Sequence, residues 1–94
     1  MNQLVNLQTP YEMTLGIARR FRRIRKLKKI TIKEVSIRSG VPYSTIRRFE
    51  SDGEIALLSF VKIVSAIGED MEIIGLLSER RPLSIEEVLR GNDQ

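Results

Sequence analysis

The sequence predicts an all-α fold of five short helices. Apolar residues recur every three or four positions along most of the chain, Thr/Ser-x-x-Glu patterns stand at two expected helix starts, and glycines stand at expected helix ends. Ninety-four residues, 41% of them apolar, suffice for one modest core. We therefore expect one domain at 14–78, an N-terminal arm at 1–13 and a short C-terminal helical extension at 79–94.

The composition removes most catalytic chemistry. The chain has no cysteine, histidine or tryptophan, so disulfides, thiol nucleophiles and imidazole or thiolate metal ligands are excluded. The remaining carboxylates, lysines, serines and tyrosines do not stand beside a glycine-rich phosphate loop or a nucleophile elbow. We expect no enzyme activity, cofactor or metal. With no stretch near the roughly 18 apolar residues of a membrane span and no signal peptide, we expect a soluble cytoplasmic protein.

Positive charge is concentrated in the first half of the chain. Residues 1–50 carry twelve Lys and Arg against three Asp and Glu, whereas residues 51–94 carry four against nine. The segment 19–29 holds eight basic residues in eleven without an acid. A solvated helix face is the common explanation of such a run, but uncompensated charges repel one another unless a polyanion neutralises them. Nucleic acid is the favoured partner, ahead of an acidic membrane surface or an acidic protein.

The first helix is expected to begin at Thr14. Residues 1–13 show no helical period and contain Pro10, which indicates an arm. From Thr14 onward one apolar stripe runs among the arginines, formed by Ile17, Phe21, Ile24 and Leu27.

Two closely spaced helices follow. Thr31 and Glu34 form a capping-box pattern that starts a helix through Ser39, and Gly40 ends it. A further helix begins two or three residues later, with Pro42 near its first turn. Apolar residues expected to hold the two helices together are Val35, Val41, Ile46 and Phe49.

Three apolar segments complete the chain. A fourth helix ends at Gly68 and has a predicted stripe of Leu57, Phe60, Val61, Val64 and Ile67. The very apolar segment 71–77 follows, and Arg81 and Pro82 stop it. Ser84 and Glu87 form a second capping box, which predicts a short helix to about Arg90.

The arrangement at 31–50 is typical of a DNA-binding helix-turn-helix, whose second helix enters the major groove. The sequence here resembles the Cro/phage-repressor (XRE) type of this motif over roughly 15–71. The matching pieces are Ile24 to Lys28, Glu34 to Ser36, Arg38 to Val41, Ser44 to Ile46, Arg48 to Glu50, Ile55 to Leu58 and Ile63 to Gly68. Two positions depart from the pattern: Ile32 replaces a common glutamine that touches the DNA backbone, and Ser36 replaces the usual alanine.

The resemblance implies a set of DNA-contacting residues. Its base-reading positions fall on Pro42, Tyr43, Ser44 and Arg48, with Arg47 beside them. An arginine can donate two bonds to guanine, but Arg47 has phosphate contact or plain exposure as its alternatives, and Tyr43 has helix packing. The expected contacts to the DNA backbone are Arg22, Arg23, Lys28, Lys29, Thr31, Lys33 and Thr45.

The same resemblance implies that Arg25 pairs with Glu50 and fixes the angle between their helices. Phosphate binding by Arg25 is the alternative to this structural role.

A single helix-turn-helix reads few base pairs, so we expect a homodimer on an inverted-repeat operator in double-stranded DNA. The candidate dimer or partner surface consists of Met71, Ile73, Ile74, Leu77, Ile85 and Leu89. Packing of the 71–77 segment as a fifth core helix is the alternative, and both hold if opposite faces are used.

Three functional hypotheses follow for this layout. Size and layout resemble HipB-like antitoxins, which bind a toxin protein and repress their own operon, and a free-standing phage or plasmid repressor is the next alternative. A protein-interaction module that kept the fold without reading DNA belongs to a different class. RNA binding is disfavoured because the aromatic residues are scattered or expected to be buried, and they form no stacking platform.

Overall fold

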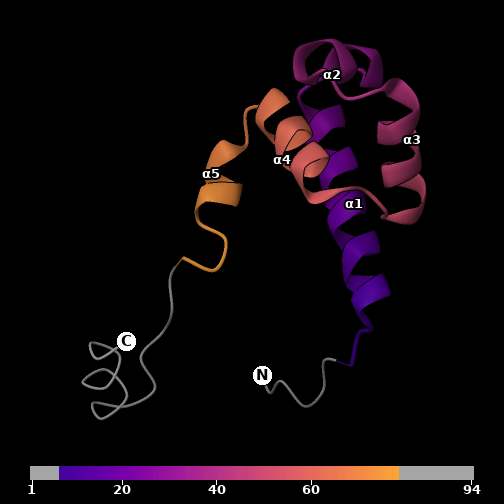
Figure 1. Cartoon of the computed structure of the whole chain (residues 1–94), viewed down its shortest axis with the longest axis vertical. Coiled ribbons are helices and arrows are strands. Elements are labelled where there is room, and N and C mark those ends of the chain that lie inside the picture. The colour runs from indigo at the N-terminus through magenta and orange to yellow at the C-terminus, as the bar shows by residue number, and fades with distance from the viewer. Residues whose placement is uncertain (1–6, 79–94) are drawn as a thin grey trace.

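The computed structural model describes residues 7–78, and this part of the chain is built from helices without strands (Figure 1). The elements are α1 (Pro10–Leu27), α2 (Ile32–Ser39), α3 (Tyr43–Asp52), α4 (Leu57–Ala66) and α5 (Asp70–Ile74). Helix α3 packs along α1, α2 contacts both α3 and α4, and α5 contacts α4. The predicted all-α fold with five helices is confirmed, while the C-terminal extension predicted at 79–94 lies outside the described residues.

Helix α1 begins at Pro10, four residues before the predicted start, so the prediction of an arm through Met13 was wrong for residues 10–13. Thr9 caps the helix: its hydroxyl accepts from the Glu12 N–H at 3.1 Å, and the Glu12 carboxylate accepts from the Thr9 N–H at 2.8 Å. Pro10 occupies the first helical turn, where a missing N–H costs nothing. The proline interpreted as a sign of irregular chain is therefore part of a helix start.

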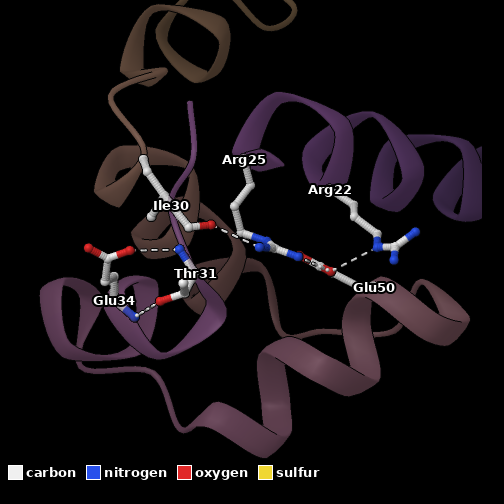
Figure 2. Close-up of polar contacts among 6 residues, drawn as sticks. All are labelled: Arg22, Arg25, Ile30, Thr31, Glu34 and Glu50. Atoms are coloured by element: carbon white, nitrogen blue, oxygen red, sulfur yellow. Dashed lines mark hydrogen bonds and ion pairs between the residues drawn. The ribbon is translucent and has the colours of Figure 1, made fainter. Parts of the chain in front are cut away.

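Helix α2 has the boundaries that its sequence predicts. The Thr31 hydroxyl accepts from the Glu34 N–H at 3.0 Å, and the Glu34 carboxylate accepts from the Thr31 N–H at 2.8 Å (Figure 2). Gly40 ends the helix at φ 77°, a left-handed conformation that glycine adopts without a steric penalty. Both signals for this helix are confirmed.

Two serine hydroxyls fix the turn between α2 and α3. Ser36 donates to the Val41 carbonyl at 2.7 Å, and Ser39 accepts from the Val41 N–H at 3.0 Å. Both backbone polar groups of Val41 are thus held by side chains of α2. The departure from alanine at Ser36 has a structural use, because its hydroxyl helps to close this turn.

One apolar core joins α1 to α4. Its buried residues are Ala18, Phe21, Val35, Val41, Ile46, Phe49, Ile63, Val64 and Ile67. This set contains all four residues that were predicted to hold the second and third helices together. Phe49 makes edge contacts with Phe21 and Phe60, at ring-centroid distances of 5.7 and 5.5 Å. The Phe49 side chain therefore connects α3 to both α1 and α4.

In the predicted apolar stripes, Ile17 is 37% exposed, and two further residues are exposed much more. Leu27 is 76% exposed and Leu57 is 73% exposed, so both assignments to the core were wrong. Each residue lies at the end of its helix. The buried face of α1 runs instead through Ala18, Phe21 and Arg25, and α4 buries Ile63, which its predicted stripe omits.

Gly53 brings the end of α3 against α1. It has φ 79°, and a Cβ built on it would lie 3.0 Å from Thr14 Oγ1 and 3.1 Å from the Leu15 backbone nitrogen. Both the left-handed backbone and the close approach require glycine here. The carboxyl end of α3 is thereby set directly on α1.

Candidate nucleic-acid interface

Helix α3 buries one face and presents the other to solvent. Ile46 and Phe49 are buried, whereas the residues predicted to read bases are all exposed, namely Pro42, Tyr43, Ser44, Arg47 and Arg48. Thr45, a predicted backbone contact, is half-buried. Tyr43 is 46% exposed, so it is not a buried packing residue. The structure therefore brings the five predicted base-reading residues together on α3 and its N-cap.

A buried ion pair fixes the orientation of α3 on α1 (Figure 2). Arg25 Nε lies 2.7 Å from Glu50 Oε2, and Arg25 Nη2 donates to Glu50 Oε1 at 2.9 Å. Arg25 Nη1 also donates to the Ile30 carbonyl at 2.8 Å, which ties in the chain that leads to α2. The two side chains are only 8% and 7% exposed. The structure thus joins the two residues that the sequence analysis paired, and Arg25 has almost no surface left for a phosphate.

Beside this pair lies an open cavity of about 450 Å³. Its lining residues come from α1, α2 and α3 and are Arg22, Arg25, Ile32, Arg47, Glu50 and Ser51. Arg22 Nε is 3.7 Å from Glu50 Oε1, at the exposed margin of the buried pair (Figure 2). Arg47 makes no ion pair with any residue of the described range 7–78. Two exposed guanidinium groups therefore border a cavity that an anion can enter.

The start of α2 lies at the same cavity, through Ile32. The capping box satisfies the N–H groups of Thr31 and Glu34. The N–H groups of Ile32 and Lys33 belong to the first turn, where an α-helix has no acceptor of its own for them. Such N–H groups, together with the helix dipole, attract anions. The Ile32 side chain is half-buried and packs against the core, so only its backbone can serve this purpose.

Arg48, on the exposed face of α3, is held by two acids. Its Nη2 donates to Glu54 Oε1 at 2.6 Å, and its Nε lies 3.4 Å from Asp52 Oδ2. These bonds, first that to Glu54 and then that to Asp52, raise the pKa of Arg48 above its ordinary value. Sequence reasoning missed both acids, although the spacing of four between Arg48 and Asp52 is a known signal for a helical ion pair.

Lys28 lies apart from the cavity. Its Nζ donates to the Ile67 carbonyl at 2.6 Å and lies 2.7 Å from Glu69 Oε2. Arg38 Nη1 donates to the neighbouring Ala66 carbonyl at 3.4 Å. These two cations thus cap the carboxyl end of α4, where the helix dipole favours positive charge. The structure gives Lys28 this structural contact, and its contact with the DNA backbone stays a prediction.

The remaining predicted backbone contacts lie on α1, in the turn after it and at the start of α2. Arg23, Lys29 and Lys33 are exposed and form no ion pair within the described residues. Thr31 uses its hydroxyl as the acceptor that caps α2. Of the predicted backbone contacts, the structure places Arg22 at the cavity margin and Lys33 in the first turn of α2.

The predicted dimer surface is divided by the structure. Ile73 packs against the core, whereas Met71, Ile74 and Leu77 are 75%, 66% and 87% exposed. Of the four predicted surface residues within the described range, only Ile73 therefore packs against the core, and the other three are exposed. Ile85 and Leu89, like the second capping box, lie outside the described residues.

Within residues 7–78, no helix is long and apolar enough to cross a membrane, and no cluster of three acidic residues is arranged to hold a metal ion.

The fold and the exposed α3 define a class of protein, the DNA-binding helix-turn-helix domains. A protein-family model described as "Helix-turn-helix" matches residues 21–74, which is more than half of the chain. The chain belongs to this helix-turn-helix family, of the Cro/phage-repressor (XRE) type. Neither the curated proteins nor the solved structures gave a match. This is a family of DNA-binding regulators and not a family of enzymes, and membership implies binding to double-stranded DNA.

Proposed function

We propose that this protein is a transcriptional repressor or autoregulator that binds an inverted-repeat operator as a homodimer and reads it with α3. The observation that supports this most directly is the pairing of a fixed helix with an exposed polar face. Arg25 and Glu50 hold α3 against α1 through a bidentate buried ion pair, while Ser44 and Arg48 face outward. A rigidly mounted helix with exposed polar side chains is what base reading in the major groove requires.

Residues that line the cavity beside α3 supply the phosphate contacts. Arg22 and Arg47 supply guanidinium groups at its margin, and the first turn of α2 supplies backbone N–H groups. The arrangement replaces the side-chain contact that a glutamine at position 32 would make. Each phosphate neutralised in this way adds affinity without sequence information and makes binding sensitive to salt.

Dimerisation is assigned to the exposed apolar side of α5. Met71 and Ile74 project from this helix, and Leu77 follows three residues after it. Contact between two copies would bury these side chains and place two α3 helices on half-sites about 34 Å apart, one turn of B-DNA.

The test is selection of duplexes from a random library by the purified full chain at about 150 mM salt, where non-specific binding is already weakened. Recovery of a short inverted repeat supports the proposal and gives the half-site spacing. Retention without a common motif overturns sequence-specific reading and favours a protein-interaction module that only attracts phosphates.

A matched pair of variants locates the interface. Arg47→Ala and Lys62→Ala each remove one exposed positive charge, from α3 and from α4 respectively. We expect Arg47→Ala to lower operator affinity by about 5- to 100-fold, the range of one good charged contact, and Lys62→Ala to change it less than twofold. Equal effects of the two variants would contradict binding through α3.

The finer roles stay predictions. Service as the antitoxin of a toxin–antitoxin pair requires a toxin protein as second partner, whereas a free-standing phage or plasmid repressor requires none. Binding of the purified chain to its own upstream DNA, with and without the product of an adjacent gene, separates these two possibilities.

A further inference from the structure

The two acids beside Arg48 hold it along one edge of its guanidinium. Glu54 accepts from Nη2 at 2.6 Å, and Asp52 Oδ2 lies 3.4 Å from Nε. The acids are themselves fixed relative to each other, because Asp52 Oδ1 accepts from the Glu54 N–H at 2.9 Å. The left-handed turn at Gly53 is what brings Glu54 back beside α3.

The opposite edge of the same guanidinium has no such partner. A guanidinium carries five N–H donors in a planar fork, one on Nε and two on each Nη. Asp52 and Glu54 engage Nε and one Nη2 hydrogen, and no residue of the described range accepts from Nη1. The outer edge, formed by Nη1 and the second Nη2 hydrogen, therefore offers two parallel donors. The Arg48 side chain is 66% exposed, so this edge is accessible.

Two parallel donors match the O6 and N7 acceptors that guanine presents in the major groove. We propose that Asp52 and Glu54 are positioning residues that hold Arg48 for the reading of one guanine in each half-site and keep it from binding phosphates. This inference rests on the proposed function, because it assumes that α3 enters the major groove.

The charge balance explains the second part of the proposal. An exposed arginine without a partner binds any phosphate within its reach, which adds affinity for every sequence equally. Arg48 with its two acids carries a net charge of −1, so this end of α3 does not attract phosphates. A guanine edge is neutral and needs no net charge, only correctly directed donors. The acids therefore disfavour binding to random DNA more than binding to a site with the right guanine.

The neighbouring arginine shows the contrast. Arg47 lines the cavity with Arg22 and makes no ion pair with a described residue. Consecutive arginines on one helix thus differ in their surroundings, and we assign phosphate contact to Arg47 and guanine reading to Arg48.

The test compares the unchanged protein with the double variant Asp52→Asn/Glu54→Gln in the full chain. Asparagine keeps the oxygen that accepts from the Glu54 N–H, so the turn is retained. Binding is measured on three kinds of duplex, each at several salt concentrations: the selected operator, a set of operators in which one guanine at a time is replaced, and an unrelated sequence. One guanine replacement should weaken the unchanged protein about 5- to 150-fold.

For the double variant we expect three changes. Affinity for the unrelated duplex rises about 2- to 10-fold, because one arginine is released from two exposed ion pairs. The slope of log affinity against log salt steepens by about one phosphate contact. The penalty for replacing that guanine shrinks severalfold.

Two controls isolate the geometry. Glu72→Gln removes one acidic charge from α5 and should leave the guanine penalty unchanged, whereas Glu54→Gln alone should reduce it. Arg48→Lys keeps the charge but loses the planar fork, so the guanine penalty should disappear. A double variant that retains the full guanine penalty and the original affinity for unrelated DNA overturns this inference alone. An unchanged protein with no preference among duplexes overturns the proposed function and this inference together.

Discussion

The contact of α1 with α3 and the contact of α4 with α5 are built on different principles. The first combines a buried ion pair, an edge contact between Phe21 and Phe49 and the close approach at Gly53. The second joins α4 to a helix of five residues that has no buried residue and no side-chain cap. The comparison teaches that the part of the molecule that presents α3 is closed by its own contacts, whereas most of the apolar side chains of α5 stay exposed.

The two contacts also differ in how firmly they fix the direction of a helix. The carboxylate of Glu50 accepts two parallel hydrogen bonds from the guanidinium of Arg25. This pairing fixes the relative orientation of the two groups as well as the distance between them. Helix α5 is held to α4 by one exposed hydrogen bond, from the Ser65 hydroxyl to Asp70 Oδ2 at 2.9 Å, and by the packing of Ile73 on the core, which together fix its direction less firmly. Four predictions, given from the largest expected effect to the smallest, examine this contrast.

Removal of the Glu50 carboxylate should be the most damaging change. Glu50→Ala leaves Arg25 buried and uncompensated, and we expect the free energy of unfolding to fall by about 3–5 kcal/mol in urea denaturation. Replacing both partners in Arg25→Met/Glu50→Met should cost clearly less, because no buried charge remains. If the single and double variants lose the same stability, the pair does not hold α3 in the way described.

Gly53 should tolerate a side chain worse than Gly40 does. Both glycines are left-handed, at φ 79° and 77°, but only at Gly53 would a Cβ meet the backbone of α1. We expect Gly53→Ala to cost about 2–4 kcal/mol, from backbone strain plus steric overlap, and Gly40→Ala about 1–2 kcal/mol, from strain alone. Thermal unfolding of the two variants measures the difference, and equal losses would contradict the close approach of α3 to α1.

The cap of α2 gives a smaller, pH-dependent effect. Thr31→Ala should cost about 0.5–2 kcal/mol in denaturation at neutral pH. The pKa of Glu34 is lowered chiefly by its hydrogen bond from the Thr31 N–H. The folded state therefore binds a proton at Glu34 less readily than the unfolded state does. The stabilisation that the ionised Glu34 carboxylate gives to the cap is thus present at neutral pH and is lost as the pH falls below the ordinary glutamate range.

Comparison with Glu34→Gln tests that sign. The variant lacks the ionised carboxylate, so its stability relative to the unchanged protein should be lowest at neutral pH and should approach it at acid pH. A difference that does not change with pH would show that the charge of Glu34 plays no part in the cap.

The smallest effect on the folded monomer is expected at α5. Ile74 is 66% exposed, so Ile74→Ser should change the stability of the dilute protein by no more than about 0.5 kcal/mol. If α5 forms the dimer contact, the unchanged protein gains stability with rising concentration and this variant gains less. Sedimentation equilibrium of both proteins reports the association directly, and equal dimerisation would place the contact elsewhere.

Local signals in the sequence were sufficient for much of the fold. Thr31, Glu34 and Gly40 mark the ends of α2 because capping and left-handed turns depend on residues only a few positions apart. The pairing of Arg25 with Glu50, 25 positions apart, came from the family resemblance and not from any local pattern. Distant pairs of this kind become visible from one sequence only when a known fold supplies the neighbours.

Other features depend on where neighbouring helices end. Leu27 and Leu57 fit their helical stripes, yet they stand at the last position of α1 and the first position of α4, and both are exposed. Glu54 stands outside α3, and its contact with Arg48 exists only because Gly53 turns the chain back. Periodicity defines which side of a helix is apolar but not how much of that side is covered.

The two hydroxyl bonds to Val41 have a consequence for DNA geometry. Ser36 and Ser39 hold its carbonyl and its N–H, so α2 and α3 are joined as one unit. In the proposed complex, the separation between a phosphate at the start of α2 and a base edge beneath α3 would then be set by the protein. DNA whose groove width does not match that separation must deform or give up one of the two contacts, and the flexibility of base steps that the protein never touches would therefore enter its choice of operator.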